Sequence, residues 1–536
     1  MRQRDIWLFL GFTVMAVAGY WLASSATLHP VARQAAPKAS LAERKVVVDE
    51  TGPKFRRENR APQSPRDDEA AENGALRNER TVVFKDKAAL EAFLKRAGDK
   101  VKILGSIDAL HALRIGFSDA ADLAGLLGPD DQASLIYPVD TPAPTDGTVQ
   151  PGAMALGARL LSWLGITMDN SSWGKGVLVA ILDTGVTAHP AFSSNISMLN
   201  LVGLPSDPAT QNGHGTAVAS MIIGNNQLTP GIAPGASVLS VRIANDLGQS
   251  DSFLLAQGII AAVDAGAKVI NISMGSQGDS PLIRDAIAYA TAANAVIVAA
   301  AGNNGLNKVS YPAANQGVIA VGAVDAMGNH LDFSNSGIQL AIAAPGYNLN
   351  AAWTGGEATM VTGTSFSSPI VAGSIAALMS RPGATPLTAS QAATQLFSYL
   401  NDAGVAGTDS EYGTGLPDLG RVINGKTPGI YDAAVASQRI VPPSSSSPFG
   451  QVEVLVQNRG TEPLYNTAVT ISTPSGNVTT TLTNLAVNGV QTVRVPITVP
   501  TATSLRYDAQ VTISGHVDAK PSNDRRVETY VPAGSP

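Results

Sequence analysis

The sequence predicts an α/β protein: a doubly wound, mostly parallel sheet, preceded by a small α+β unit and followed by an all-β sandwich. Three observations support this fold class. Between residues 177 and 400, short apolar runs alternate with segments of helical period, as in a sheet covered by helices on both faces. Residues 81–138 read as strands and helices in the order βαββαβ. After residue 450, Val and Thr alternate with polar residues between Gly, Asn and Pro turns.

The composition is that of a globular protein with more than one domain. The chain has 536 residues, and single cores rarely grow beyond roughly 250–300 residues. Hydrophobic residues make up 44% and charged residues 15%, with a net charge of −6. Nothing in this balance indicates a nucleic-acid partner. There is no cysteine, which excludes thiol catalysis, cysteine-ligated zinc and disulfides.

The first 26 residues have the pattern of a secretory signal. Two arginines lie within residues 1–5, residues 6–23 are almost wholly apolar, and small residues follow up to Ala26. We therefore expect an exported protein, whether secreted, periplasmic or at the cell surface. The apolar run also reaches the length of a spanning helix, so the alternative is an uncleaved membrane anchor through residues 6–23. Residues 27–78 are expected to form a flexible linker.

The ordered chain is expected to begin with a ferredoxin-like α+β unit. Its strands and helices are predicted at 81–86 (strand), 86–98 (helix), 102–117 (two strands), 119–127 (helix) and 133–138 (strand). A segment rich in Pro, Gly, Thr and Asp follows, and residues 139–157 are expected to be a processing linker.

The central region is predicted to form the doubly wound sheet. Strands are expected at 177–183, 237–243, 269–273, 296–300, 318–324 and 340–343, and helices are expected to begin near Thr216, Ser252, Pro281, Ser367 and Thr388. In such sheets, the crevice at the carboxyl ends of the strands binds ligands.

Ser365 is a candidate nucleophile because of its place in the chain. The small-residue turn from Gly363 to Ser365 precedes an apolar segment of helical period, so the hydroxyl lies at a helix start. Pro369 fits a first helical turn, where its missing N–H costs nothing. In isolation, Ser365 would be an ordinary helix-capping serine. A serine becomes nucleophilic when an imidazole takes its proton and a carboxylate orients that imidazole.

Asp183 and His214 supply these two groups. Asp183 ends an apolar strand, so its carboxylate faces the crevice, and His214 lies between two glycines just before an apolar helical run. Taken singly, Asp183 could cap the next segment and His214 could be an ordinary loop histidine. Together with Ser365 they predict a catalytic triad in the order Asp, His, Ser.

Four motifs resemble those of the subtilisin-like serine proteases, the subtilases of peptidase family S8. They are LDTGV at 182–186, NGHGTAVAS at 212–220, VIVAAAGNNG at 296–305 and GTSFSSPIVAG at 363–373. The triad order is that of subtilisin. The resemblance covers about residues 160–422 and implies a serine endopeptidase with Asp183, His214 and Ser365 as the triad. It places Asn303 as the oxyanion donor, with Asn304 as the competing assignment.

The resemblance also implies how polypeptide substrates bind. A substrate would lie as an extended strand between edges at 247–249 and 273–275. The residues expected to bind it are Gly248, Ser273, Met274, Gly275, Ala300, Ala301, Gly302 and Ser310. Because these walls are apolar and uncharged, we expect a hydrophobic residue before the cleaved bond, at P1.

The flanking regions resemble accessory domains of the family. Residues 79–138 resemble an I9-type propeptide, which would act as the chain's own intramolecular inhibitor and be removed by self-cleavage between residues 137 and 157. Residues 158–427 are expected to be the catalytic domain. Residues 428–536, with a Pro/Ser linker at 441–450, resemble a bacterial CARDB module of the immunoglobulin-like type. The chemistry requires no cofactor and we name no metal ligand. Structural calcium stays open, because the loops at 224–231 and 303–310 look short for the family.

Two other functions were weighed against proteolysis. The alternative is a surface adhesion or binding protein whose protease-like domain is an inactive scaffold; the intact triad together with Asn303 argues against it. A nucleotide-binding α/β protein does not fit, because the glycines flank His214 and Ser365 and form no phosphate loop after a first strand.

Overall fold

The computed structural model of the chain describes residues 74–141, 150, 152–193, 196–202, 212–443, 449–500 and 503–532. The predicted signal or anchor, residues 1–26, and the predicted linker as far as residue 73 lie outside the described residues. The chain divides into two units, Met1–Gly52 and Pro53–Pro536. All described elements belong to the second unit.

The N-terminal part of this unit is a four-stranded antiparallel sheet with two helices. Its elements are β1 (Glu79–Val83), α3 (Lys87–Ala97), β2 (Lys102–Ile107), β3 (Ala112–Gly116), α4 (Ala120–Ala124) and β4 (Gln132–Leu135), and the sheet has the strand order β2-β3-β1-β4. α3 begins where the Asp86 carboxylate accepts the Ala89 N–H at 2.8 Å. Phe84, Phe93 and Leu123 are fully buried in a core of its own.

The central sheet has seven strands, all parallel, in the order β13-β12-β11-β10-β6-β8-β7. They are β6 (Leu178–Asp183), β7 (Ile196–Asn200), β8 (Ser237–Arg242), β10 (Val269–Ile272), β11 (Val296–Ala300), β12 (Val318–Val324) and β13 (Leu340–Pro345). All six predicted strands are present. The additional edge strand β7 was not predicted, because its sequence ISMLN is partly exposed and lacks a buried-strand pattern.

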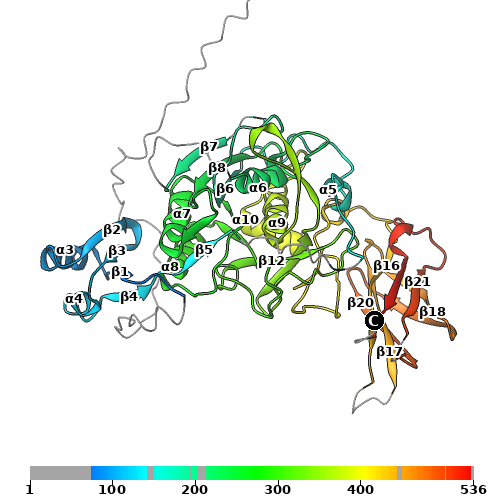
Figure 1. The fold of residues 1–536 in the computed structure, drawn as a ribbon. Helices are drawn as coiled ribbons and strands as arrows, with labels where there is room; N and C mark the ends of the chain where they lie inside the picture. The colour runs from blue at the N-terminus through cyan, green and yellow to red at the C-terminus, as the bar shows by residue number, and fades with distance from the viewer. Residues whose placement is uncertain are drawn as a thin grey trace, which may run out of the picture. The chain divides into compact units, whose positions relative to one another are not determined.

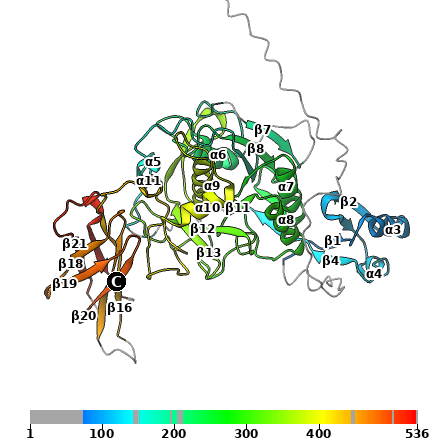
Figure 2. The same cartoon turned by 180° about the vertical axis from the view of Figure 1, so that it is seen from behind.

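Helices cover both faces of this sheet. In Figures 1 and 2, α6 (His214–Ile223), α9 (Thr364–Met379) and α10 (Ala389–Phe397) lie on one side, and α7 (Ser252–Asp264) and α8 (Pro281–Ala292) lie on the other. Alternate residues of β6 face opposite cores: Val179 and Ile181 pack with α6 and α9, whereas Ala180 and Leu182 pack with α7 and α8. The remaining elements are β5 (Pro138–Asp140), which follows the N-terminal sheet, and, in the catalytic region, α5 (Leu160–Trp163), β9 (Gln249–Asp251), β14 (Leu349–Ala352), β15 (Ala358–Val361) and α11 (Leu419–Asn424).

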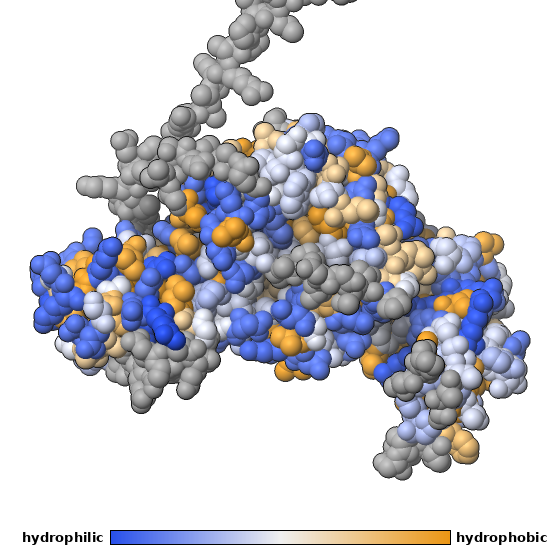
Figure 3. Space-filling view, in the orientation of Figure 1, coloured by the Kyte–Doolittle hydropathy of each residue, from blue (hydrophilic) through white to orange (hydrophobic). Residues whose placement is uncertain are grey.

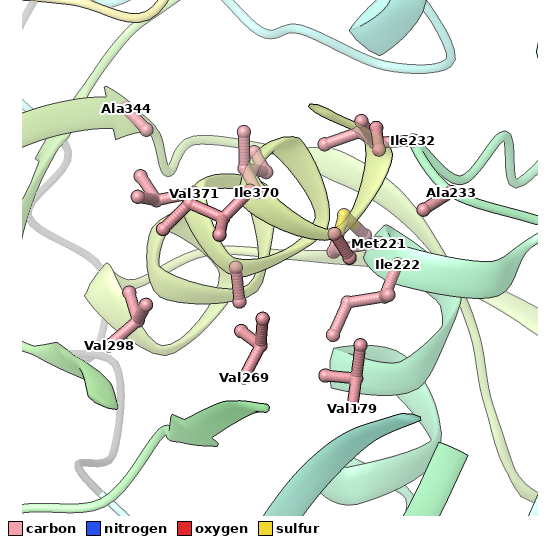
Figure 4. Packing of buried hydrophobic residues seen from close by; sticks show 14 of the residues in the cluster. Val179, Met221, Ile222, Ile232, Ala233, Val269, Val298, Ala344, Ile370 and Val371 are labelled. Atoms are coloured by element: carbon pink, nitrogen blue, oxygen red, sulfur yellow. The ribbon is translucent and has the colours of Figure 1, made fainter. Parts of the chain in front are cut away.

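The helix α9 is the centre of the first core. Each of its 16 residues is buried, and Figure 4 shows apolar side chains of the sheet and of α6 gathered round it. The helix begins at Thr364, three residues before the predicted start near Ser367. Pro369 is therefore the sixth residue of the helix and not part of its first turn. Its missing N–H leaves the carbonyl of Ser365 without its helical partner.

The C-terminal part is a sandwich of two antiparallel sheets. Its strands are β16 (Ala433–Val441), β17 (Gly450–Asn458), β18 (Leu464–Thr473), β19 (Gly476–Leu485), β20 (Val490–Ile497), β21 (Leu505–Thr512) and β22 (Arg525–Tyr530), in sheets ordered β16-β17-β20 and β19-β18-β21-β22. The predicted Pro/Ser linker at 441–450 connects two paired strands, because Val441 of β16 lies opposite Gln451 of β17. It is a hairpin connection within the sandwich and does not mark the start of it.

The described ends of the expected processing linker are part of the fold. At one end β5 pairs antiparallel with β9. At the other end Leu156 is buried, and the N–H groups of Leu156 and Gly157 donate to the carbonyls of Tyr347 and Asn348 at 3.2 and 2.8 Å.

The surface carries no long apolar helix in the part of the chain that the structure describes. No helix there is long and apolar enough to cross a membrane. On the face shown in Figure 3, hydrophobic residues are scattered among hydrophilic ones.

Candidate active site

Asp183 and His214 form a buried pair at the carboxyl edge of the sheet. Asp183 is the last residue of β6 and His214 the first of α6. The Nδ1 atom of His214 lies 2.9 and 3.0 Å from the two carboxylate oxygens of Asp183. The backbone N–H of Thr184 also donates to Asp183 Oδ1, at 2.7 Å. This pairing fixes the orientation of the imidazole and directs Nε2 away from the carboxylate.

Gly215 allows the two elements to approach this closely. A Cβ atom at this position would lie 2.3 Å from the carbonyl oxygen of Gly185 and 3.2 Å from Asp183 Oδ1. The first turn of α6 can therefore pass the end of β6 only without a side chain there.

Ser365 lies beside this pair, but its hydroxyl does not bond to His214. Ser365 is the second residue of α9, and its Oγ donates to the carbonyl of Ser273 at 3.1 Å. The buried His214 Nε2 has no hydrogen-bond partner among the described residues. The ring of Phe366, the next residue, lies 5.3 Å from the His214 ring. The structure thus brings the three predicted residues together, with Ser365 Oγ turned toward β10.

Asn303 is tied to the residue that precedes Ser365. Its Oδ1 accepts the backbone N–H and the hydroxyl of Thr364, at 2.9 and 2.8 Å. Gly363 has a φ of 139°, and a Cβ there would lie 2.8 Å from Asn303 Nδ2, so only glycine fits. Asn303 is buried, whereas the competing candidate Asn304 is exposed.

The predicted wall of the P1 pocket is assembled from three segments. The N–H of Ser310 donates to the carbonyl of Ala301 at 2.9 Å. A Cβ on Gly275 would lie 3.2 Å from Ser310 Cβ, and a Cβ on Gly302 would lie 2.5 Å from Ser310 Oγ. The neighbouring wall residues Ser273, Met274 and Ala300 are also buried.

An extended segment of the chain lies between the two predicted edges of the cleft. Asp140 and Gly275 exchange two backbone hydrogen bonds of 3.0 Å, and the N–H of Thr141 donates to the carbonyl of Gly248 at 2.9 Å. Burial in this position raises the pKa of the Asp140 carboxyl. Both edges therefore already bind a peptide strand, which belongs to the chain itself.

Several residues that build the site were missed in the sequence. Thr364 and Asn335 organise the Asn303 loop: Asn335 Oδ1 accepts the N–H of Asn304 at 3.0 Å. Asn271 is connected to the carbonyl of Ser365 through the hydroxyl of Ser273. The signal available for Asn271 and Asn335 was a polar residue within an otherwise apolar or small-residue run, VINIS and FSNS.

The described residues contain no group of three or more His, Cys, Asp or Glu side chains that could hold a metal ion.

Comparison with known proteins places this geometry in a family. The model of the subtilase family, Peptidase_S8, matches residues 174–415. The thermostable alkaline protease of Halalkalibacterium halodurans is 38% identical over 258 residues, 46% of this chain and 68% of that protein. The alkaline protease of Alkalihalobacillus alcalophilus is 32% identical over 353 residues, 62% of this chain and 88% of that protein.

A further relative and a solved structure are also similar to the chain. Subtilisin Savinase of Lederbergia lenta is 36% identical over 252 residues, 45% of this chain and 89% of that protein. The crystal structure of the epidermin leader peptide processing serine protease of Staphylococcus aureus covers 66% of this chain and 99% of its own, with 21% identity and a TM-score of 0.54, and supports the fold.

The fold defines the class of protein, together with the Asp183–His214 pair and the adjacent Ser365. The protein is a serine endopeptidase, which acts on polypeptides. The chain belongs to the subtilase family, which confirms the resemblance seen in its motifs.

Proposed function

We propose that the protein is an exported, self-maturing serine endopeptidase with Ser365 as nucleophile, His214 as general base and Asp183 as the group that orients it. The observation that carries the proposal is the buried contact of His214 Nδ1 with Asp183 at 2.9 Å, beside a serine at the start of a helix. An inactive adhesion scaffold would have no use for this pair together with Asn303.

His214 transfers the hydroxyl proton of Ser365 to the leaving amine. In the described state Ser365 Oγ donates to the Ser273 carbonyl, so the side chain must first rotate toward His214 Nε2. His214 then takes the proton as Ser365 attacks the scissile carbonyl, and returns it to the leaving amine. In the second half of the reaction His214 takes a proton from the water that attacks the acyl-enzyme, and it gives this proton to Ser365 Oγ as the acyl bond breaks and the acid product leaves. Asp183 stabilises the imidazolium in both halves.

Asn303 supplies a donor to the oxyanion. Since its Oδ1 is occupied by two donors of Thr364, its Nδ2 end is directed away from that residue. The Ser365 backbone N–H, at the first turn of α9, is the second donor.

Substrates bind as Asp140 and Thr141 do, by main-chain hydrogen bonds to Gly275 and Gly248. Such bonds place little demand on substrate sequence, so selectivity comes from the P1 pocket. Its walls, which include Ala301 and Gly302, are buried and uncharged. This supports a preference for a hydrophobic P1 residue.

The N-terminal α+β unit acts as an I9-type inhibitory propeptide. Its last strand, β5, fills the cleft in the same way as a substrate would. We expect self-cleavage after Thr141 and before Gly152. Residues from Leu156 onward are bonded to the catalytic domain and would stay with the mature enzyme.

We propose that the C-terminal sandwich is a CARDB-like module, which its two antiparallel sheets support. It supplies none of the residues that we assign to catalysis. Export rests on the apolar segment 6–23 of the sequence, with retention as a membrane anchor as the alternative.

The test compares the wild type with Ser365→Ala in full-length form. We expect the wild-type chain to lose its N-terminal unit over time, observed by intact mass spectrometry, while Ser365→Ala stays full length. A peptidyl phosphonate should label the wild type only. The new N-terminus then gives the cleaved bond.

Asn303→Leu tests the oxyanion donor, and its melting temperature is measured beside its kcat because the variant also removes the acceptor of Thr364. We expect its kcat to fall by about 10²–10³, the known magnitude for loss of this donor in subtilisin, with KM little changed. If wild type and Ser365→Ala both stay intact and neither is labelled, the scaffold function replaces this proposal.

A further inference from the structure

We propose that Asn271 is a positioning residue for Ser365 and acts through a buried chain of hydrogen bonds between β10 and α9. The inference rests on the proposed role of Ser365 as nucleophile. Asn271 touches neither the substrate strand nor the reacting atoms, so any effect on the reaction must pass through the residues that it holds.

Asn271 lies in an apolar environment where an amide is costly. It is the third residue of β10, is fully buried, and is flanked in the sheet by Ile181 of β6 and Val298 of β11. Moving an amide from water into such an environment costs free energy unless its hydrogen bonds are replaced. Val269, two residues earlier and therefore on the same face of the strand, points toward α9 in Figure 4. Asn271 accordingly faces the nucleophile helix.

The hydrogen bonds form a continuous chain from α9 to β10 and back. Ser368 Oγ donates to Asn271 Oδ1 at 2.7 Å, and Asn271 Nδ2 donates to Ser273 Oγ at 2.9 Å. Ser273 Oγ then donates to the carbonyl of Ser365 at 2.6 Å. All four side chains are at most 1% exposed. This chain of hydrogen bonds starts at Ser368 and ends at Ser365, two residues of α9 that are three positions apart.

Pro369 explains why this chain is needed. In an uninterrupted helix the carbonyl of Ser365 would accept the N–H of residue 369, and Pro369 has none. The hydroxyl of Ser273 supplies the missing donor. Because Asn271 Nδ2 donates to Ser273 Oγ, the hydroxyl proton of Ser273 must point elsewhere, toward Ser365. Asn271 thus sets the direction of the bond that holds the nucleophile's backbone.

The start of α9 depends on such external ties. Its N-cap residue is Gly363, which offers no side-chain cap. Another tie is the contact of Thr364 with Asn303, on the residue next to Ser365. Since β10 is the direct neighbour of β6 in the sheet, the chain through Asn271 fixes Ser365 relative to the strand that ends in Asp183.

Ser368→Ala is the decisive variant. It removes the hydroxyl that holds the amide oxygen of Asn271, and it leaves Ser273 and Ser365 unchanged. Ser374→Ala is the matched control. Ser374 lies on the same helix and is equally buried, but its hydroxyl donates to the carbonyl of Ile370 within the helix, at 2.8 Å. Full-length wild type and both variants are allowed to mature. Then kcat, KM, the rate of phosphonate labelling and the melting temperature are measured.

We expect Ser368→Ala to lower kcat and the labelling rate about three- to tenfold, with KM changed less than about twofold. Ser374→Ala should keep the wild-type kcat and labelling rate. The melting temperature should fall by a similar amount in both variants. Asn271→Ala and Ser273→Ala should lower kcat by about tenfold or more. Ser368→Ala decides the question even where those two variants do not fold.

The inference is overturned if Ser368→Ala and Ser374→Ala have the same kcat and labelling rate, or if Ser368→Ala raises KM alone. Failure of the proposed function gives a different result. In that case the phosphonate would label neither the wild type nor Ser365→Ala.

Discussion

The N-terminal α+β unit and the C-terminal sandwich contact the catalytic domain by different kinds of bonds. The N-terminal unit is held through the backbone of β5, paired with β9, through the ion pair of Arg114 with Asp251 at 2.7 Å, and through apolar residues such as Leu110 that share a core with α7. The sandwich is held through buried side chains around Arg421. Under the proposed self-maturation, the first contact has to be released, whereas the second is permanent.

Arg421 is the centre of the permanent contact. Its guanidinium donates to the carbonyl of Leu400 at 2.8 Å and to Asn401 Oδ1 at 3.0 Å on the catalytic side. On the sandwich side it donates to the carbonyl of Arg459 at 3.2 Å and bonds the side chain of Asn488. Arg421 is 8% exposed, so its removal would leave several buried acceptors without donors.

The largest expected effect is therefore that of Arg421→Ala. We expect the free energy of unfolding to fall by about 3–5 kcal/mol, because all the buried acceptors of the Arg421 guanidinium lose their charged donor together. Chemical denaturation of the Ser365→Ala background, which avoids self-digestion, measures the change.

Arg439→Ala is the control for this prediction. Arg439 lies on β16 of the same sandwich, is half-exposed, and pairs with Glu453; an exposed pair of this kind contributes about 0–1 kcal/mol. Equal effects of the two variants would contradict the idea of a permanent contact. The sandwich would then be a loosely attached module, suited to binding a surface.

Arg114→Ala should have the next largest effect, on release of the N-terminal unit. Although burial lowers the pKa of the guanidinium, Asp251 and Glu79 raise it more, so Arg114 carries its charge in the contact. Removing it should shorten the lag before activity appears by roughly tenfold or more, because a partly buried charge pair is lost. The lag is measured with a chromogenic peptide that carries a hydrophobic P1 residue.

Lys85→Ala serves as the matched variant for Arg114→Ala. Lys85 forms an exposed ion pair with Asp130 inside the N-terminal unit, and its loss should leave the lag unchanged. An unchanged lag in Arg114→Ala as well would show that main-chain pairing and the apolar core shared with α7 hold the unit without this ion pair.

The smallest expected effect is that of Asp140→Asn. Burial raises the pKa of Asp140 above 3.8, so docking of β5 is strongest when the carboxyl is protonated and weakens as the pH rises through the raised pKa. At neutral pH the ionised carboxyl opposes docking. Asparagine removes this charge, and the lag should lengthen a few-fold at pH 7.

The pH dependence separates this effect from a change of shape. The difference between Asp140→Asn and the wild type should shrink as the pH falls toward 3.8, where the wild-type carboxyl is protonated as well. Asp99→Asn, at an exposed carboxylate of the same unit, should behave as the wild type at every pH. A shorter lag in Asp140→Asn would contradict the prediction.

The sequence was informative where local pattern decides structure. The strand before Asp183 and the helices after His214 and Ser365 were predictable, because long apolar runs bounded by glycines have few other readings. The edge strand β7 was missed because an edge strand is only partly buried and shows no clear alternation. The composition of 441–450 predicts a linker between domains instead of a hairpin connection, because Pro and Ser are typical of any loop, within a domain or between two.

What the sequence could not show is the set of contacts between distant residues. Ser368 and Asn271 are 97 positions apart, and Arg114 and Asp251 are 137 apart. Nor could it show the rotamer that turns Ser365 toward Ser273. Such contacts depend on how the strands are ordered in the sheet, which local patterns do not determine.

The complete burial of α9 bears on how this enzyme could be changed by evolution or in the laboratory. Nearly every substitution along that helix would alter a packed surface, so few would be tolerated. The edges of the cleft differ: Leu247, beside Gly248, is 78% exposed. Random libraries at 245–249 should therefore yield folded enzymes with new substrate preferences, whereas libraries at 366–378 should yield mainly unfolded chains. The helix that carries Ser365 should therefore tolerate few substitutions.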